Sequence, residues 1–233
     1  MPKSIVAEAT SAKGASVKFV ATAADATGNP AAVTCRPASG SVFPLGATKV
    51  TCTATSSGLS SSKSFSVTVV DTAPPTLFVS DVIADAVSPA GAAVPYTATA
   101  VDSVSGELAP ACSPPSGDMF AIGHTTVTCT ASDARGNSAS ASFDVHVKGA
   151  AAQTADLRAL LASLTVVDPL GTKLDEKLAD VQKHIADGPL TGACGGLADF
   201  VDRVRKESGQ RLTTEQAGRL VADATRIRAV LAR

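Results

Sequence analysis

Apolar and small polar residues alternate in short runs through the first two thirds of the chain. The runs cover roughly residues 4–9, 16–24, 32–36, 48–55 and 64–70, and then 75–84, 93–101, 111–113, 125–132 and 142–147. A period of two residues is typical of half-buried antiparallel strands, and the Gly, Pro and Asn residues between the runs indicate turns. Several short strands separated by such turns predict a β-sandwich of the immunoglobulin type.

The two sets of strands are copies of one sequence, set 77 residues apart. Cys35 matches Cys112, Cys52 matches Cys129 and Asp25 matches Asp102. The other matched pairs are Pro37 with Pro114, Gly40 with Gly117, Phe43 with Phe120, Gly46 with Gly123, Thr48 with Thr125, Val50 with Val127 and Thr51 with Thr128. We therefore predict two immunoglobulin-like sandwiches in tandem, at residues 1–71 and 72–148, joined by a short, stiff segment that contains Pro74 and Pro75.

The first copy lacks one segment of the second. At this offset Met1 falls opposite Phe78, so the first copy has no counterpart of Pro74-Pro75-Thr76-Leu77. One explanation is that the chain was cut from a longer protein inside a repeat, which also accounts for the absence of an apolar signal segment after Met1. The other is that a sheet edge stays open for a strand from elsewhere.

The pattern changes to helical spacing at Thr154, where apolar residues begin to recur every three or four positions. The groups are Leu157, Leu160, Leu161 and Leu164; Leu174, Leu178, Val181 and Ile185; Leu197, Phe200, Val201 and Val204; and Leu220, Ala224, Ile227 and Leu231. Thr213 and Gln216 predict a capping box at the start of the last group. We predict a small all-α domain of four helices at residues 154–233, after a flexible linker at 149–153.

The cysteine spacing predicts one disulfide in each repeat. Cys35 and Cys52 lie 17 residues apart, and Cys112 and Cys129 repeat that spacing without the neighbours of a zinc site. Each disulfide would stabilise its small domain by about 3 kcal/mol, and disulfides predict an extracellular protein, secreted or attached to a surface. The alternative is buried free thiols in a cytosolic protein. The remaining Cys194 is expected to be a free thiol buried in a helix, or else the partner in an intermolecular disulfide.

Charge and hydropathy argue against two classes of partner. The net charge is −1, from 20 basic and 21 acidic residues, and few Lys or Arg lie in the β half, so we expect no nucleic-acid partner. No run of 18 apolar residues predicts membrane insertion. Aromatic residues make up only 3% of the chain and are needed in the two cores, which leaves few for a sugar-binding face.

Candidate chemistry is sparse. The three histidines, His124, His146 and His184, form no Ser-His-Asp or Cys-His pattern, so we expect no enzyme activity. Several acidic residues near loops offer oxygen ligands for calcium, and the candidate ligands are Asp25, Asn29, Asp71 and Asp102, with Asp81, Asp85 and Asp133 also near junctions. The alternative is that these residues only form turns and that no cofactor binds.

Each copy resembles the hyalin repeat, or HYR, family. The resemblance rests on Cys35-Arg36-Pro37, Ser39-Gly40, Phe43, Gly46 and Val50-Thr51-Cys52-Thr53-Ala54-Thr55, and on their matches Cys112-Ser113-Pro114, Ser116-Gly117, Phe120, Gly123 and Val127-Thr128-Cys129-Thr130-Ala131-Ser132-Asp133 with Gly136-Asn137. It implies an immunoglobulin-like fold in extracellular proteins, associated with adhesion or spacing and without catalysis. Many family members carry a second cysteine pair, which is missing here.

The helical part is similar to the FIMAH module of bacterial multimodular secreted proteins. The similarity runs from Ala193-Cys194 through Leu197, Phe200, Val204 and Gln210-Arg211-Leu212-Thr213 to Gln216-Ala217 and Ile227. It implies an accessory part of a secreted protein.

These patterns together predict a non-catalytic extracellular module for adhesion, spacing or presentation, the C-terminal accessory part of a larger secreted bacterial protein. The expected partner is a protein or a cell-surface or polysaccharide ligand. The alternative is a structural subunit that polymerises into filaments or decorates a particle surface, through strand donation.

Overall fold

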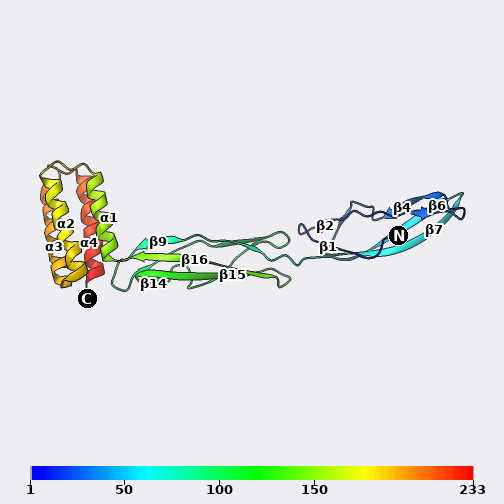
Figure 1. The fold of residues 1–233 in the computed structure, drawn as a ribbon, viewed down its shortest axis with the longest axis horizontal. Coiled ribbons are helices and arrows are strands. Elements are labelled where there is room, and N and C mark those ends of the chain that lie inside the picture. The colour runs from blue at the N-terminus through cyan, green and yellow to red at the C-terminus, as the bar shows by residue number, and fades with distance from the viewer. Residues whose placement is uncertain (1, 233) are drawn as a thin grey trace. The chain divides into compact units, whose positions relative to one another are not determined.

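The computed structural model describes residues 2–232, which form two compact units (Figure 1). The first unit holds the residues up to Phe78 together with Ala98–Ala111 and Cys129–Ala141. The second holds Val79–Thr97, Cys112–Thr128 and the residues from Ser142 onward. The second β-repeat is thus divided between the two units, and four helices follow it, as the sequence predicts.

The first repeat contains one large sheet and one small one. The large sheet has the strand order β1 (Ile5–Glu8), β7 (Leu59–Val70), β6 (Gly46–Ser56), β4 (Pro30–Arg36) and β3 (Ala23–Ala24), and the small sheet pairs β2 (Ala15–Ser16) with β5 (Val42–Phe43). Strands β6 and β7 form a long antiparallel hairpin, whereas β1 runs parallel to β7. Because of this parallel pairing, β1 ends beside the end of β7, where the first repeat joins the next one.

The second repeat follows a similar plan, with nine strands in place of seven among the described residues. One sheet has the strand order β13 (Ala111–Ser113), β15 (Gly123–Ser132), β16 (Ser138–Lys148) and β9 (Val82–Asp85). A second has the order β12 (Gly106–Leu108), β11 (Thr99–Asp102) and β8 (Thr76–Phe78). A third pairs β10 (Ala92–Ala93) with β14 (Met119–Phe120). Strand β9 runs parallel to β16, as β1 does to β7. Strand β8 pairs with β11, and β3, the equivalent of β11, pairs only with β4 among the described residues.

Three predicted strands are wrong because each is interrupted. The prediction at residues 16–24 covers only the ends β2 and β3, and that at 93–101 covers β10 and β11. Between them the Ser39 hydroxyl accepts from the backbone N–H of Phe19 at 2.8 Å and donates to its carbonyl at 2.7 Å, and Ser116 does the same for Tyr96. A side chain thus replaces the neighbouring strand. The prediction at 75–84 divides into β8 and β9, which belong to different sheets.

Aromatic rings pack together in both cores, where the sequence predicts that the few aromatic residues are needed. Phe19 packs edge-to-face against Phe65 at 5.0 Å between ring centroids and against Phe43 at 6.5 Å. In the second repeat, Tyr96 takes the place of Phe19 and contacts Phe143 at 4.9 Å. Valines and alanines fill the remaining core.

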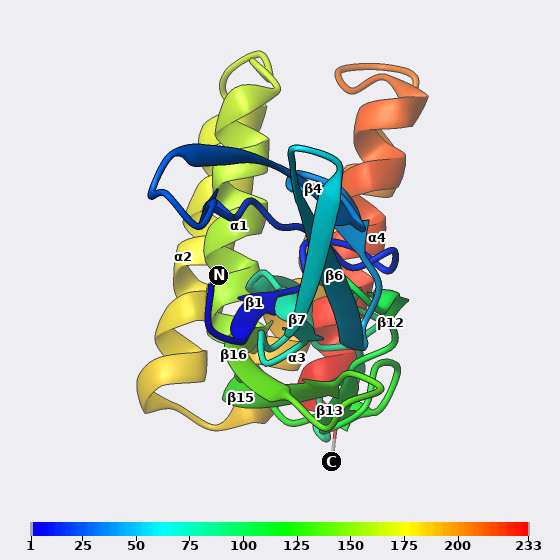
Figure 2. The ribbon, with the colours of Figure 1, turned by 90° about the vertical axis from the view of Figure 1, so that its right-hand side faces the viewer.

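The four helices are α1 (Ala150–Ser163), α2 (Leu170–Asp187), α3 (Leu190–Glu207) and α4 (Thr214–Leu231). They lie side by side, each packed against the next, and α1 also contacts α4, which closes the bundle (Figures 1 and 2). The predicted capping box is present, because Gln216 N–H donates to Thr213 Oγ1 at 3.1 Å and Thr213 N–H donates to Gln216 Oε1 at 2.9 Å. No helix of residues 2–232 is long and apolar enough to cross a membrane.

The predicted flexible linker at residues 149–153 is wrong. Strand β16 ends at Lys148 and α1 begins at Ala150, which leaves only Gly149 between them. The run of alanines favours helix, and Gln153, only 1% exposed, ties this first turn to the sheet by donating from Nε2 to the carbonyls of Ala86 at 3.0 Å and Lys148 at 2.7 Å.

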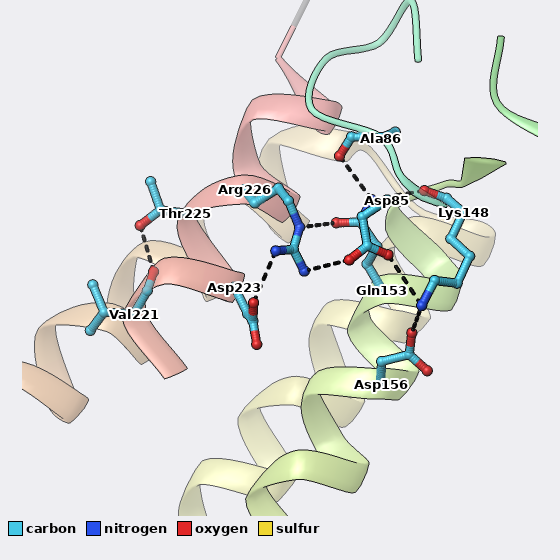
Figure 3. Close-up of polar contacts among 9 residues, drawn as sticks. All are labelled: Asp85, Ala86, Lys148, Gln153, Asp156, Val221, Asp223, Thr225 and Arg226. Carbon is cyan, nitrogen blue, oxygen red and sulfur yellow. Dashed lines mark hydrogen bonds and ion pairs between the residues drawn. The ribbon is translucent and has the colours of Figure 1, made fainter. Parts of the chain in front are cut away.

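Charged side chains complete this attachment of the helices to the end of the second repeat (Figure 3). Arg226 of α4 donates from Nε to Gln153 Oε1 at 3.0 Å, and its Nη2 lies 2.9 Å from Asp85 Oδ2 at the end of β9. Lys148 Nζ lies 3.2 Å from Asp85 Oδ1 and also pairs with Asp156 of α1. The carboxylate of Asp85 is therefore neutralised by two cations from its own chain. These ion pairs hold the helices to the second repeat in addition to the covalent connection.

We predict that Gly91→Ala destabilises the protein more than Gly117→Ala, although both glycines have a positive φ, of 112° and 88°. A Cβ on Gly91 would lie 1.9 Å from the carbonyl oxygen of Phe120, whereas nothing lies within 4 Å of one on Gly117. Gly117→Ala should cost about 1 kcal/mol for the left-handed backbone, and Gly91→Ala about 1–3 kcal/mol more for the clash. Denaturant unfolding measures both, and equal costs would contradict the packing at Gly91.

A second prediction concerns Gln153. Gln153→Leu leaves the buried carbonyl of Ala86 without its partner and removes the contacts to the Lys148 carbonyl and to Arg226, so it should cost about 1–3 kcal/mol of unfolding free energy. The control is Gln210→Leu, because the amide of Gln210 is exposed and makes one 3.4 Å contact; it should change stability by less than about 0.5 kcal/mol. If the two variants unfold alike, the Gln153 contacts do not stabilise the attachment.

Candidate metal centre

Three buried aspartates lie close together where the linker between the repeats, residues 71–75, reaches the second repeat. Asp71 follows β7, Asp102 ends β11 and Asp133 follows β15, and all three belong to the first compact unit. Their exposed fractions are 8%, 4% and 8%. One carboxylate oxygen from each lies within 4.8 Å of the other two. Carboxylates are rarely buried unless they are paired, so this cluster stands apart from the acidic residues of an ordinary surface.

Local turns hold two of the three carboxylates. Asp102 Oδ1 accepts the backbone N–H groups of Val104 at 2.9 Å and Ser105 at 2.6 Å. Asp133 Oδ1 accepts those of Arg135 and Asn137, both at 2.8 Å. These are the turn contacts that aspartate commonly makes with the backbone a few residues ahead, and they set the direction in which the second oxygen of each group points.

Asp71 has no such support. Neither of its carboxylate oxygens, both buried, accepts a hydrogen bond from any residue between positions 2 and 232. Its backbone carbonyl accepts from Asn137 Nδ2 at 3.1 Å, and the same amide nitrogen donates to Asp133 Oδ2 at 2.7 Å. The position of Asp71 is therefore fixed through its backbone, while its side chain stays without a partner inside the cluster.

Glu8, at the end of β1, holds the linker from the other side. Its Oε1 accepts the N–H of Thr72 at 2.7 Å and of Ala73 at 3.2 Å, and its Oε2 accepts the Thr72 hydroxyl at 2.9 Å. Glu8 of the first repeat and Asn137 of the second thus bind adjacent residues of the linker.

The pKa values of Asp71, Asp133 and Glu8 are shifted in different directions. Burial, and then the neighbouring charges of Asp102, Asp133 and Glu8, raise the pKa of Asp71. Burial also acts to raise the pKa of Asp133, but hydrogen bonds from Asn137, Arg135 and Gly136 outweigh it, and the net pKa is lowered. Hydrogen bonds from Thr72 lower the pKa of Glu8. Negative charge is thus stable on Asp133 and Glu8 and is unfavourable on Asp71 between them.

The candidate calcium ligands fall into two places. Asp71 and Asp102 lie together, with Asp133 as third member. Asp25 and Asn29 lie at the turn after β3, where Asp25 Oδ1 accepts from Thr27 N–H at 2.9 Å, Thr27 Oγ1 at 2.7 Å and Asn29 N–H at 2.9 Å. Whether any of these residues binds a metal stays a prediction.

In the sequence, Asp133 stands out only as an acidic residue near a junction, and Glu8 does not stand out. In the first copy Ser56 occupies the position equivalent to Asp133. The turn Asp133-Ala134-Arg135-Gly136-Asn137 directly after a strand was the signal that could have identified it. Glu8 gives no sequence signal, because its role depends on the parallel pairing of β1 with β7.

The remaining singled-out residues lie elsewhere. The expected Cys35–Cys52 disulfide is present between directly paired positions of β4 and β6, and Cys112 and Cys129 are also disulfide-bonded. Cys194 is a half-buried free thiol in α3. His124 stacks on His146 at 4.1 Å between ring centroids and pairs with Asp144, whereas His184 contacts the carbonyl of Asp180 in its own helix.

One family model matches part of the chain. The HYR domain model matches residues 70–147, which is the second repeat with the end of β7. No curated protein matches the chain. The match and the disulfides indicate an extracellular, adhesion-type module.

Solved structures similar to this chain include cadherins. The human protocadherin-24 EC1-2 structure is 13% identical over 62% of this chain and 94% of that one, with a TM-score of 0.29. Drosophila N-cadherin EC1-4 is 18% identical over 59% and 40%, with a TM-score of 0.30, and protocadherin gamma B2 domains 1–5 are 15% identical over 63% and 38%, with a TM-score of 0.32.

We predict that the charge on Asp71 destabilises the metal-free protein as pH rises. An acid whose pKa is higher in the folded state than in the unfolded state binds more protons when folded, so its stabilising contribution is present at low pH and is lost as pH rises through the folded-state pKa. In EDTA, the stability of wild type relative to Asp71→Asn should therefore fall as pH rises above the ordinary pKa of an aspartate, about 4. Thermal unfolding at a series of pH values measures the difference.

The exposed aspartate Asp202 of α3 gives the control for this prediction. Asp202→Asn removes the same charge from a solvated site and should show little pH dependence relative to wild type. A stability difference between wild type and Asp71→Asn that is independent of pH, or that grows with pH, would contradict the effect of burial on Asp71.

Proposed function

We propose that this chain is a non-catalytic extracellular spacer that holds its repeats at a fixed joint and presents them for adhesion. The observation that carries the proposal is the polar joint around the linker. There Glu8 accepts hydrogen bonds from the N–H groups of Thr72 and Ala73, and Asn137 donates one to the carbonyl of Asp71. A flexible tether has no need for such contacts. Pro74 and Pro75, which follow directly, restrict the backbone further.

The arrangement of the histidines supports a role without catalysis. A general base needs a nucleophile within hydrogen-bond reach and a third group to orient it. The ring of His124 pairs with the carboxylate of Asp144, and His146 stacks on it at the surface of the strands β15 and β16. This pairing fits a cross-strand contact between side chains.

The setting is proposed from the resemblance of the helices to the FIMAH module. On that basis the chain is the C-terminal accessory part of a larger secreted bacterial protein, and its repeats bind a protein or a cell-surface polysaccharide. A glycan array probed with the full chain tests the polysaccharide, and the absence of any hit would leave a protein as the partner.

One observation favours the alternative of a polymerising structural subunit. Strand β11 has neighbours on both sides, β12 and β8, whereas its counterpart β3 has only β4 among the described residues. The free edge of β3 could accept a donated strand from another copy. Light scattering at high protein concentration separates the two functions, since the spacer stays monomeric and the donated strand gives higher assemblies.

We predict that Glu8→Ala loosens the joint. Spin labels introduced through unnatural amino acids at Lys63 and Asp118, one in each repeat, report the distance between the repeats by pulsed electron resonance. With 5 mM calcium present, the unmutated joint should give one narrow distance distribution, and Glu8→Ala should broaden it severalfold because the linker N–H groups lose their acceptor. The exposed Glu107→Ala is the control and should leave it narrow. A broad distribution before mutation would reject the spacer function.

A further inference from the structure

The buried carboxylates of Asp71, Asp102 and Asp133 carry more charge than the protein around them neutralises. None of the ion pairs among residues 2–232 includes any of the three. Asp71 is more than nine-tenths buried, and neither of its carboxylate oxygens has a hydrogen-bond partner among the described residues. An ionised carboxylate taken out of water without a partner is strongly unfavourable, and three close together repel one another. The described residues therefore leave much of this charge unbalanced.

We propose that Asp71, Asp102 and Asp133 bind one calcium ion. A cation placed among them would supply the missing partner of Asp71 and relieve the repulsion between the three carboxylates. Asp71 offers two free oxygens, and Asp102 and Asp133 each have one oxygen held by turn N–H groups, which orients the other. The cluster is therefore held in place before an ion arrives.

The donor set selects the kind of cation. All three ligands are hard carboxylate oxygens, and no histidine or cysteine belongs to the cluster, which disfavours zinc, copper and iron. Calcium takes six to eight oxygens in flexible geometry, with carbonyls and waters completing the set. Magnesium needs a nearly ideal octahedron and gives up its waters reluctantly. Ligands drawn from two loops and a linker suit the larger ion.

The same site does not recur at the other positions that the duplication provides. At the tip of the first repeat Asp25 matches Asp102, but Ser56 matches Asp133, so one carboxylate of the set is missing. Where the second repeat meets the helices, Lys148 and Arg226 neutralise Asp85 and leave no unpaired carboxylate for an ion. The chain therefore carries its complete three-carboxylate set at the linker between the repeats.

A bound ion would join the linker to the second repeat. Asp71 comes from the linker, whereas Asp102 and Asp133 come from two loops of the second repeat, and Glu8 of the first repeat holds the next residue, Thr72. Calcium would then stiffen the joint at extracellular concentrations and release it in a calcium-poor compartment. This consequence rests on the proposed spacer function, whereas the binding itself does not.

Calorimetric titration of the full chain with calcium chloride, after removal of metal with EDTA, tests the binding. We expect one site with a Kd of about 0.1–1 mM, the range of extracellular calcium modules, and weaker binding of magnesium. Calcium at 100 times Kd should raise Tm by about 5–10 °C. Asp71→Asn and Asp102→Asn should abolish both responses, while Asp25→Asn, at the incomplete site, should keep them.

Asp71→Asn also controls for misfolding. Because it removes a buried unpaired charge, it should unfold in EDTA at a temperature equal to or above that of wild type at neutral pH. Wild type without heat or Tm shift at 10 mM calcium would overturn the proposal, and so would an unchanged response in Asp71→Asn. If wild type does not respond to calcium, Asp71 is neutral because it is protonated. The stability of wild type relative to Asp71→Asn, measured as a function of pH, would show this.

The spin-label distances separate this inference from the spacer function. If calcium binds but the distribution is equally narrow in EDTA, the site stands and the joint does not depend on it. If calcium binds and the distribution stays broad throughout, the site stands and the spacer function fails. A narrow distribution without calcium binding supports the spacer and rejects the site.

Discussion

A carboxylate at the end of a parallel strand secures each repeat to the next part of the chain. Strand β1 runs parallel to β7 and brings Glu8 beside the linker, and β9 runs parallel to β16 and brings Asp85 beside the helices. Glu8 accepts from Thr72 and Ala73, and Asp85 pairs with Arg226 and Lys148. Polar contacts of this kind therefore supplement cores that contain few aromatic residues.

The two joints balance buried charge in different ways. At the helical joint, Lys148 and Arg226 lie on either side of Asp85, and the buried amide of Gln153 joins the network through Arg226. At the joint between the repeats, Asp71 has no cation from the described residues and lies against two more aspartates. The first joint is completed by partly exposed ion pairs within the chain, which salt in the medium screens. Under the calcium proposal, an ion from outside the chain completes the second joint, so its strength should depend on calcium.

Local pattern and duplication predicted much of the fold. The offset between the copies located the Cys35–Cys52 pair and the aromatic anchors, because equivalent residues in two copies of one fold share their surroundings. Periodicity could not reveal that Ser39 and Ser116 replace a neighbouring strand, since each acts on a residue 20 positions away. Nor could it place the start of α1, which Gln153 holds against the sheet. Asp133 stood out only as an acidic residue near a junction, because it belongs to a loop that the two copies do not share.

The most direct measurement of the central claim is a crystal structure grown with calcium and recorded at a wavelength where calcium scatters anomalously. The account predicts an anomalous peak among the carboxylates of Asp71, Asp102 and Asp133, with oxygen ligands at about 2.3–2.6 Å. A structure in which this position is empty or holds only water, or in which a donor from the protein reaches both oxygens of Asp71, would contradict it.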